Sequence, residues 1–223
     1  MSRKEPLYTG QIFHIYNRSV GGEILFNNQY EYLRMVESMK FYKQRPKEFR
    51  FCDFLRIKQL ESYQKPSKIS AQIGPQENAV EIIAYCLMSN HVHFVLKQLE
   101  DGGISRFMGN VQNSYARYFN TKYERRGHLW QSTFKNTLVE SDEQLLQLTK
   151  YVHLNPVKAK MTSDPSDWTF SSYNEFVGKL EASKKMTSFE NYIDCSANEY
   201  ARFVCEETPS QRELAMLNEV VLE

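Results

Sequence analysis

Two apolar runs separated by three residues constrain the fold of this chain more than any other feature. Residues 80–87 (VEIIAYCL) and 91–98 (HVHFVLKQ) are both apolar and rich in residues that favour β-strands. The intervening MSN is short enough for a tight turn, so the two runs are predicted to pair as an antiparallel hairpin. We therefore expect a sheet that is antiparallel at this point.

The segments around the hairpin alternate between strand-like and helix-like patterns. Residues 11–18 alternate apolar and polar side chains, as a half-buried strand does, and residues 132–139 predict another strand. Apolar residues recur at helical spacing from residue 27 to about 44 and again from 104 to 120. Each of these two stretches is predicted to be a helix.

A third helix is predicted to begin at Ser141. Ser141 and Gln144 have the spacing of a capping box, and Pro156 is expected to stop the helix at about Leu154. The order strand, helix, strand, strand, helix, strand, helix is that of an α+β domain. We expect a ferredoxin-like antiparallel sheet with helices packed on one face.

Length and composition favour a single catalytic domain with additions. The chain has 223 residues, of which 41% are apolar, enough for one substantial core. We assign residues 1–178 to the main domain and interpret residues 46–79 as an irregular insertion with room for one short helix. Residues 179–223 are interpreted as a C-terminal extension of unknown role, with a helix predicted at 197–206.

Global charge and cysteine usage exclude several classes of site. The chain has 28 Lys and Arg against 27 Asp and Glu, so a nucleic-acid site must come from local clustering. Its four cysteines lack C-x-x-C spacing, which favours reduced thiols over a zinc site or a disulfide framework. Neither an apolar leader nor a membrane-spanning run is seen, so we expect a cytoplasmic protein.

His91 and His93 form the first candidate site. They are separated by one residue in a predicted strand, so both imidazoles point to the same face and could bind one divalent ion. A buried histidine that is hydrogen-bonded to a neighbour is the alternative interpretation. The pair also occurs in zinc hydrolases, so it needs a partner motif.

Tyr151 and Asn155 supply a candidate partner motif. They are four residues apart on the third helix, so a phenol and an amide oxygen could reach the same point. Alternatively, Tyr151 packs on the sheet and Asn155 ends the helix before proline. His153 lies on a different helical face and is expected to be structural or to face DNA. Tyr115 and Tyr118 are rival nucleophiles, although their periodicity is more typical of core or groove residues.

A basic stretch between residues 106 and 135 is the candidate DNA-binding surface. This stretch contains six Lys or Arg residues and one Glu, which gives a local charge of +5, and aromatic residues are interleaved with the cations. Cations for phosphates and rings for unstacked bases are typical of a groove for single-stranded or hairpin DNA. A solvated charge run is the alternative for the stretch, and a core anchor is the alternative role for its tryptophan. The candidate residues are Arg117, Lys122, Arg125, Arg126, Trp130 and Lys135.

The ordered motifs FHIYNR, AYCLMSNHVHFVL, YARYFN, GHLWQSTFKN and YVHLNPVKA resemble those of the single-tyrosine HUH transposases, specifically the REP-associated tyrosine transposases. The resemblance covers about residues 8–178. It implies the HUH endonuclease fold, metal binding by His91 and His93, and a nucleophilic Tyr151. It also implies a polar metal ligand one helical turn after the tyrosine. This is Gln in related transposases, and Asn155 stands there in this chain.

The sequence therefore predicts a transposase-like DNA endonuclease and strand transferase that uses Mg²⁺ or Mn²⁺. The resemblance implies a 5′-phosphotyrosine link to single-stranded or hairpin DNA. One alternative is a hairpin-binding protein of the same fold that has lost catalysis. Another is a metal hydrolase for a small substrate, which is disfavoured because neither matched motif contains Asp or Glu. Monomer and homodimer both stay open, as does whether the protein still transposes.

Overall fold

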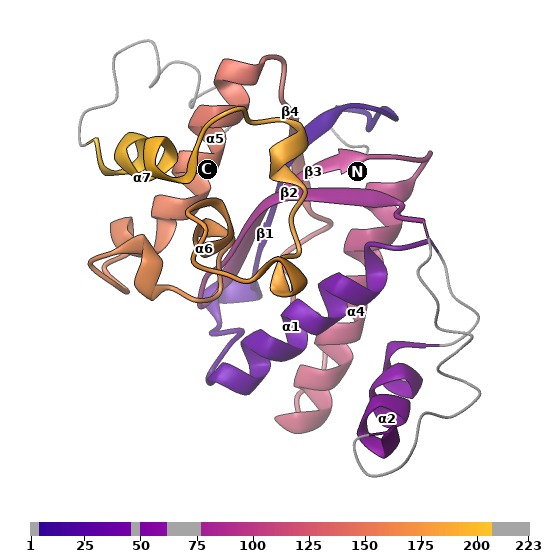
Figure 1. Ribbon diagram of the computed structural model, residues 1–223. Coiled ribbons are helices and arrows are strands. Elements are labelled where there is room, and N and C mark those ends of the chain that lie inside the picture. Colours follow the sequence, from indigo (N-terminus) through magenta and orange to yellow (C-terminus); the bar gives the residue numbers. More distant parts are fainter. Residues whose placement is uncertain (1–4, 46–49, 62–76, 207–223) are drawn as a thin grey trace.

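The computed structural model describes residues 5–45, 50–61 and 77–206 of the chain. Four strands form one sheet, and helices lie on both sides of it (Figure 1). The strands are β1 (Ile12–Arg18), β2 (Val80–Leu87), β3 (His91–Gln98) and β4 (Lys135–Leu138). The helices are α1 (Gln29–Tyr42), α2 (Phe51–Glu61), α4 (Gly103–Lys122), α5 (Asp142–Lys158), α6 (Tyr173–Phe176) and α7 (Ala197–Cys205).

The sheet has the strand order β2-β3-β1-β4, and every neighbouring pair is antiparallel. With α1 between β1 and β2 and α4 between β3 and β4, this is the ferredoxin-like arrangement. The predicted α+β class is therefore confirmed, and the predicted hairpin is β2 and β3 joined by residues 88–90.

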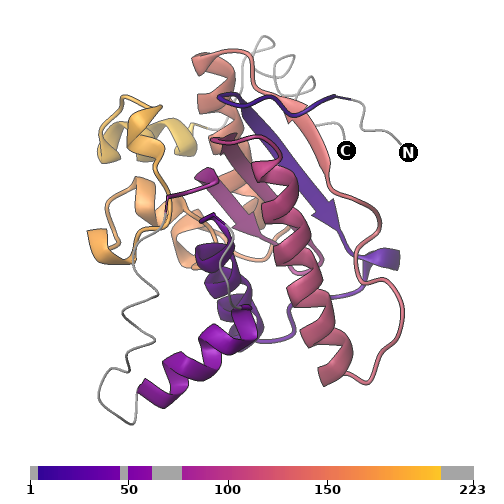
Figure 2. The same ribbon diagram turned by 90° about the vertical axis from the view of Figure 1, so that its right-hand side faces the viewer.

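The prediction that the helices pack on one face is wrong. α1 and α4 cover one face of the sheet, whereas α5, α6 and α7 lie over the other, as Figures 1 and 2 show. On β3, Phe94 and Leu96 pack towards α1 and α4, while Val95 packs in the cluster that contains residues of α5. The physical reason is that β2 and β3 are apolar on both faces, and a strand of that kind requires cover on both sides.

Helix α5 runs further than the sequence predicts. It continues through Pro156 to Lys158 instead of stopping at about Leu154. Proline removes one backbone N–H from the helix, and the bond lost is the one to the carbonyl of Val152. The Asn155 amide nitrogen approaches that carbonyl at 3.5 Å and donates to the carbonyl of Tyr151 at 3.0 Å. The asparagine thus partly replaces the donor that proline lacks.

The insertion contains the one helix for which its composition has room, α2, and residues 62–76 of the insertion lie outside the described residues. The segment that follows α6 packs on the second face of the sheet. Its anchor is the buried carboxylate of Glu175, which accepts hydrogen bonds from the backbone N–H groups of Met186 and Thr187, both at 2.9 Å. The described part of the C-terminal extension is therefore packed against the main domain.

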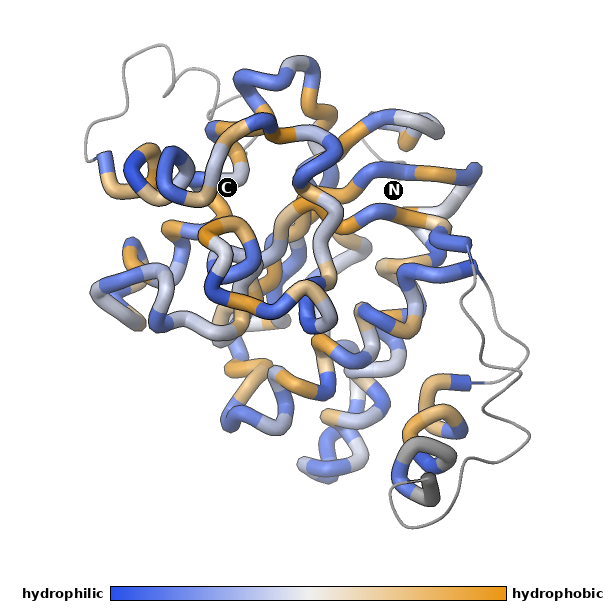
Figure 3. Tube along the Cα trace, in the orientation of Figure 1, coloured by the Kyte–Doolittle hydropathy of each residue, from blue (hydrophilic) through white to orange (hydrophobic). Residues whose placement is uncertain are grey.

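Hydrophobic residues gather along the central strands and on the helix sides that face them, as the colouring of Figure 3 shows. The predicted helix at 197–206 is observed as α7, which docks on α5 through the hydroxyl of Tyr200. Within the described part of the chain, none of the helices combines the length and apolar character needed to cross a membrane.

Candidate active site between β1, β3 and α5

The register of β1 and β3 brings two rows of polar side chains together. Tyr16 pairs with His93, and Arg18 pairs with His91. Alternate residues of a strand share a face, so His14, Tyr16 and Arg18 line the same face as the two histidines of β3. This is the face that α5 covers. The predicted metal ligands therefore stand in a row opposite a second polar row.

His93 is fully buried at the centre of this arrangement. Its Nδ1 lies 3.1 Å from Nε2 of His14, which is also fully buried, and the two rings stack at 5.4 Å between centroids. Burial lowers the pKa of His93 well below its ordinary value, and the nearby His14, His91 and Arg18 add to that effect. His93 is therefore a neutral imidazole, the form that binds metal ions.

His91 is more exposed and has its tautomer fixed by a neighbour. Its Nδ1–H donates to the side-chain oxygen of Asn90 at 2.6 Å, which leaves a lone pair on Nε2. The ring lines a surface cleft together with Arg18, Gly21 and Gly22. A ligand that enters this cleft from solvent could thus reach the His91 side of the pair.

Tyr151 projects from α5 towards the buried histidines. Its ring centroid lies 5.7 Å from that of His93 and 6.2 Å from that of His14, edge to face in both cases. The ammonium group of Lys158 lies 4.8 Å from the centre of the tyrosine ring. Tyr151 is only 9% exposed, yet it also lines a largely apolar surface cleft with Leu154. The structure thus brings the ring of the predicted nucleophile beside His93, one member of the predicted His pair.

The donor set fits a divalent metal ion as far as the described residues go. Two neutral imidazoles and an amide oxygen are acceptable ligands for Mn²⁺, and with added water for Mg²⁺. Among residues 5–45, 50–61 and 77–206, no group of three or more His, Cys, Asp and Glu is arranged to hold a metal. A third protein ligand from these described residues would therefore be of another residue type. The hydrogen bonds of Asn155 described above use its nitrogen and not its oxygen, so its role as that ligand stays a prediction.

The alternative site residues His153, Tyr115 and Tyr118 contact protein groups that suit a structural role. His153 is fully buried between the hydroxyl groups of Tyr200 and Ser172, both at 2.7 Å, and burial lowers its pKa to about 3. Tyr115 is a buried residue of α4 whose hydroxyl donates to the carbonyl of Leu25 at 2.6 Å, and burial raises its pKa. Tyr115 and Tyr118 pack in the cluster on the far face of the sheet, away from the His pair.

The predicted DNA-binding cations are spread over both faces. Arg117 is exposed on α4, and Lys122 pairs with the buried Glu31 at 2.6 Å. Arg125 pairs with Glu23 at 2.8 Å. Lys135 lies beside the candidate active site, with its ammonium group 5.4 Å from the Tyr16 ring. The basic stretch is therefore continuous in sequence but not one surface.

Two further residues of the predicted DNA-binding set differ in exposure. Arg126 is exposed in the loop after α4. Trp130 is 9% exposed, and its indole N–H donates to the carbonyl of Gln112 at 3.1 Å, as the core-anchor interpretation expects. DNA contact by either residue stays a prediction.

Sequence reasoning missed the β1 side of the site. His14, Tyr16 and Arg18 were noticed only as part of the FHIYNR motif, not as site residues. The signal was available in the two-residue spacing, because a histidine, a tyrosine and an arginine at i, i+2 and i+4 of a strand share one face. What the sequence could not supply was the partner strand, since the register with β3 is a tertiary property.

Comparisons with known proteins find similarity to transposases. The model of a family described as "Transposase IS200 like" matches residues 57–155, which include the His pair, Tyr151 and Asn155. A putative REP-associated tyrosine transposase from Haemophilus influenzae is 24% identical over 107 residues, which cover 44% of this chain and 61% of that protein. The chain thus spans less than two thirds of that relative's length. The resemblance that the motifs indicated is confirmed.

Solved structures were also compared. A REP-associated tyrosine transposase bound to a REP hairpin aligns with a TM-score of 0.46 and 15% identity, over 88% of this chain and 96% of that one. A tRNA(His) guanylyltransferase from Saccharomyces cerevisiae aligns with a TM-score of 0.34 and 10% identity, over 98% of this chain and 80% of that one.

Proposed function

We propose that this chain, as a relative of the REP-associated tyrosine transposases, is a DNA endonuclease and strand transferase acting on single-stranded or hairpin DNA in the cytoplasm. The observation that carries the proposal is the convergence of Tyr151 from α5 on His93 and His14 from the two central strands. A phenol held beside buried neutral imidazoles is an arrangement that a purely structural tyrosine does not require.

The chain's own residues supply the nucleophile and its activation. The Tyr151 oxygen forms a bond to a backbone phosphorus while the bond from phosphorus to the 3′-oxygen breaks, leaving a 5′-phosphotyrosine and a free 3′-hydroxyl. The phenol loses its proton and the departing oxygen gains one, so the reaction consumes neither water nor ATP. An unperturbed phenol has a pKa near ~10, so a nearby cation helps it to act as a nucleophile, and the ammonium group of Lys158 lies 4.8 Å from the centre of the Tyr151 ring.

A divalent ion completes this site. Mg²⁺ or Mn²⁺ held by His91, His93 and the Asn155 amide would polarise the phosphate and offset the charge that develops on its oxygens. The neutral state of His93 and the fixed tautomer of His91 prepare both rings for that role.

The proposal is tested by looking for a covalent adduct. Protein is mixed with Mn²⁺ and 5′- or 3′-labelled hairpin oligonucleotides, and the products are separated on a denaturing gel. Because the tyrosine becomes joined to the 5′-phosphate at the cut, we expect the wild type to carry the 3′ label into the protein adduct, whereas the 5′ label leaves with the free strand that ends in the 3′-hydroxyl. Tyr151→Phe should lower adduct yield by at least about a thousandfold, since it removes the nucleophile, while DNA binding stays nearly intact.

The matched control is Tyr115→Phe, which removes the rival hydroxyl on the far face of the sheet. This variant should retain adduct formation. Adduct formation by Tyr151→Phe at the wild-type level would contradict the assignment. Hairpin binding by the wild type without any adduct would instead identify a protein of the same fold that has lost catalysis. Metal-dependent phosphatase activity without an adduct would favour a hydrolase of small substrates.

A further inference from the structure

A second cleft lies on the face of the sheet remote from Tyr151, between α1, the beginning of α2 and α4. We call it the Arg34 cleft. It is lined by Arg34, Arg50, Arg117 and Lys122, together with polar residues of α4 such as Asn110 and Asn113. None of the residues that line it is an Asp or a Glu. The wall is therefore cationic and polar, with tyrosine and phenylalanine rings between the charges.

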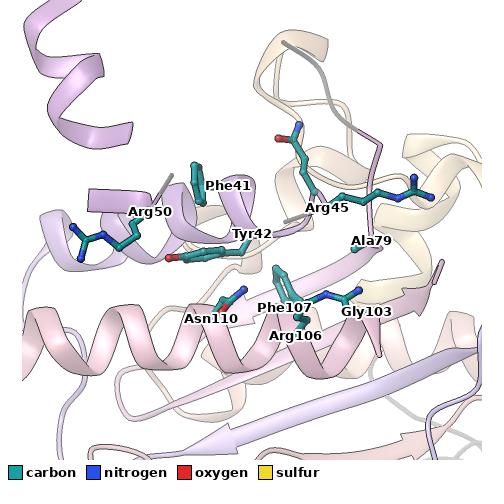
Figure 4. A pocket seen from close by; sticks show the side chains of 10 residues that line it. Phe41, Tyr42, Arg45, Arg50, Ala79, Gly103, Arg106, Phe107 and Asn110 are labelled. Atoms are coloured by element: carbon teal, nitrogen blue, oxygen red, sulfur yellow. The ribbon is translucent and has the colours of Figure 1, made fainter. Parts of the chain in front are cut away.

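The cleft continues into a neighbouring one along the same two helices. Tyr42 of α1 and Asn110 of α4 line both clefts, and Figure 4 shows them facing one another between the helices. The neighbouring cleft adds Arg45 and Arg106, which are paired with Glu77 and Glu100. An extended ligand could therefore lie along the α1 and α4 boundary.

Arg34 is the unusual residue of this surface. Its guanidinium carbon lies 4.3 Å from the centre of the Tyr118 ring and 5.5 Å from that of Phe51. Its Nε atom is enclosed and has no hydrogen-bond partner within the described part of the chain. No ion pair of Arg34 with a carboxylate occurs among residues 5–45, 50–61 and 77–206. Partial burial solvates the charge poorly and so lowers the pKa of the guanidinium group.

The other cations of the cleft divide into two kinds. Lys122 is neutralised by the buried Glu31 at 2.6 Å, and Arg50 is paired with Asp53 at 3.2 Å. Arg117 is exposed and, among the described residues, has no ion pair. Two guanidinium groups, Arg34 and Arg117, thus remain without a carboxylate inside the described chain. A partly buried cation without a counter-charge is costly to fold, so an external anion is the natural partner.

We propose that the Arg34 cleft binds the phosphodiester backbone of single-stranded nucleic acid, with Arg34 and Arg117 as its phosphate contacts. A guanidinium fork pairs with two phosphate oxygens at once, and it does so best when an aromatic ring fixes its plane, as Tyr118 does here. The ring of Tyr42 and the amides of Asn110 and Asn113 then meet the bases or sugars. The inference extends the proposed DNA substrate to the far face, but its binding step needs neither Tyr151 nor a metal.

The test measures binding without cleavage. Fluorescence anisotropy of a labelled single-stranded oligodeoxynucleotide is followed in EDTA over a series of salt concentrations. The variants are Arg34→Met, Arg34→Lys and Arg117→Met, and the control is Arg202→Met, an exposed arginine on α7. We expect Arg34→Met to bind about tenfold more weakly, with a salt slope shallower by about 0.7, the value for one phosphate contact on a single strand. Arg34→Lys should be intermediate, and Arg202→Met unchanged.

Melting temperature separates binding from folding. Removing a poorly solvated cation should leave the melting temperature of Arg34→Met equal to or above that of the wild type. A lower melting temperature with unchanged affinity and salt slope would show that Arg34 is structural and overturn the proposal. A second arm titrates inorganic phosphate. If phosphate stabilises the wild type but not Arg34→Met while oligonucleotide affinity is equal in both, the cleft binds small anions and the nucleic-acid proposal fails.

The proposed strand-transfer activity and this inference can fail separately. Weaker binding with a shallower salt slope in Arg34→Met would support the cleft even if no tyrosine adduct ever forms. Conversely, adduct formation with normal binding in Arg34→Met would keep the catalytic proposal and remove this one.

Discussion

The face of the sheet under α1 and α4 is packed with large apolar side chains, whereas the face under α5 buries three histidines. Phe13, Ile15 and Phe94 are fully enclosed on the first face. His14, His93 and His153 are fully enclosed on the side of α5. His153 comes from α5, but the other five residues come from β1 and β3, and each of these strands contributes alternate residues to the two faces.

The two faces therefore contribute differently to the stability of the fold. Burial of apolar surface stabilises a fold by roughly 25 cal/mol per Å², so the α1 and α4 face can supply most of the stability. A buried polar group only breaks even when it is hydrogen-bonded. The histidines of the α5 face therefore stabilise little in themselves, and for His14 and His93 the proposed function supplies a reason for their burial.

The different roles of the two faces are tested most directly by altering neighbouring residues of β3 that point to opposite faces. Phe94→Ala empties a site beside Phe107 in the apolar cluster and should destabilise the protein by about 3–5 kcal/mol. Metal binding by the folded protein should be unchanged. The free energy of unfolding is measured by urea titration, and Mn²⁺ affinity by electron paramagnetic resonance. A loss below ~1 kcal/mol would show that this face does not carry the stability.

The opposite substitution is His91→Ala on the α5 face. His91 is partly exposed and fixed by Asn90, so its removal should change stability little. Its loss should weaken Mn²⁺ binding by more than about a hundredfold. Mutating a residue that only hydrogen-bonds a metal ligand already lowers metal affinity about ten- to hundredfold, and His91 is a proposed ligand itself. His128→Ala, at an exposed histidine in the loop after α4, is the matched control and should keep the wild-type affinity. Equal Mn²⁺ affinity in the two variants would remove His91 from the site.

The sequence predicts the local elements well because their signals are local. The limits of β2, β3 and α4 agree with the apolar patterns to within two residues, and the capping serine of α5 accepts from the N–H of Gln144 as its position indicates. The predicted end of α5 was wrong. Helix propensity treats Pro156 as a stop, but it does not describe how the side chain of Asn155 compensates for the backbone donor that proline lacks.

Tertiary features were harder to predict, and for a physical reason. The packing of helices on both faces of the sheet was not predicted, although β2 already has the unbroken apolar run of a strand buried on both faces. His14 was missed because its importance comes from a hydrogen bond to a residue 79 positions away. Likewise, the basic stretch was interpreted as one groove, but α4 and β4 carry its cations to different places.

The smallest expected effect concerns His153, which tests whether the buried polar residues of the α5 side make the fold sensitive to acid. Burial lowers the pKa of His153 to about 3, against an unfolded value near ~6.5. Below pH ~6.5 this imidazole is therefore protonated in the unfolded chain, whereas in the folded protein it stays neutral until the pH falls to about 3. Stability is fully present above pH ~6.5 and is lost as pH falls, by about 2 kcal/mol at pH 5 from this residue.

His153→Gln removes the titrating group while keeping an amide between the hydroxyl groups of Tyr200 and Ser172. Urea titrations at pH 7 and pH 5 should show a smaller loss of stability on acidification in the variant than in the wild type. Some loss should remain, because burial also lowers the pKa of His93 and that histidine adds a contribution of the same sign. If the two proteins lose stability in parallel, His153 does not carry the acid sensitivity, and the polar and apolar faces differ less in their response to pH than their composition indicates.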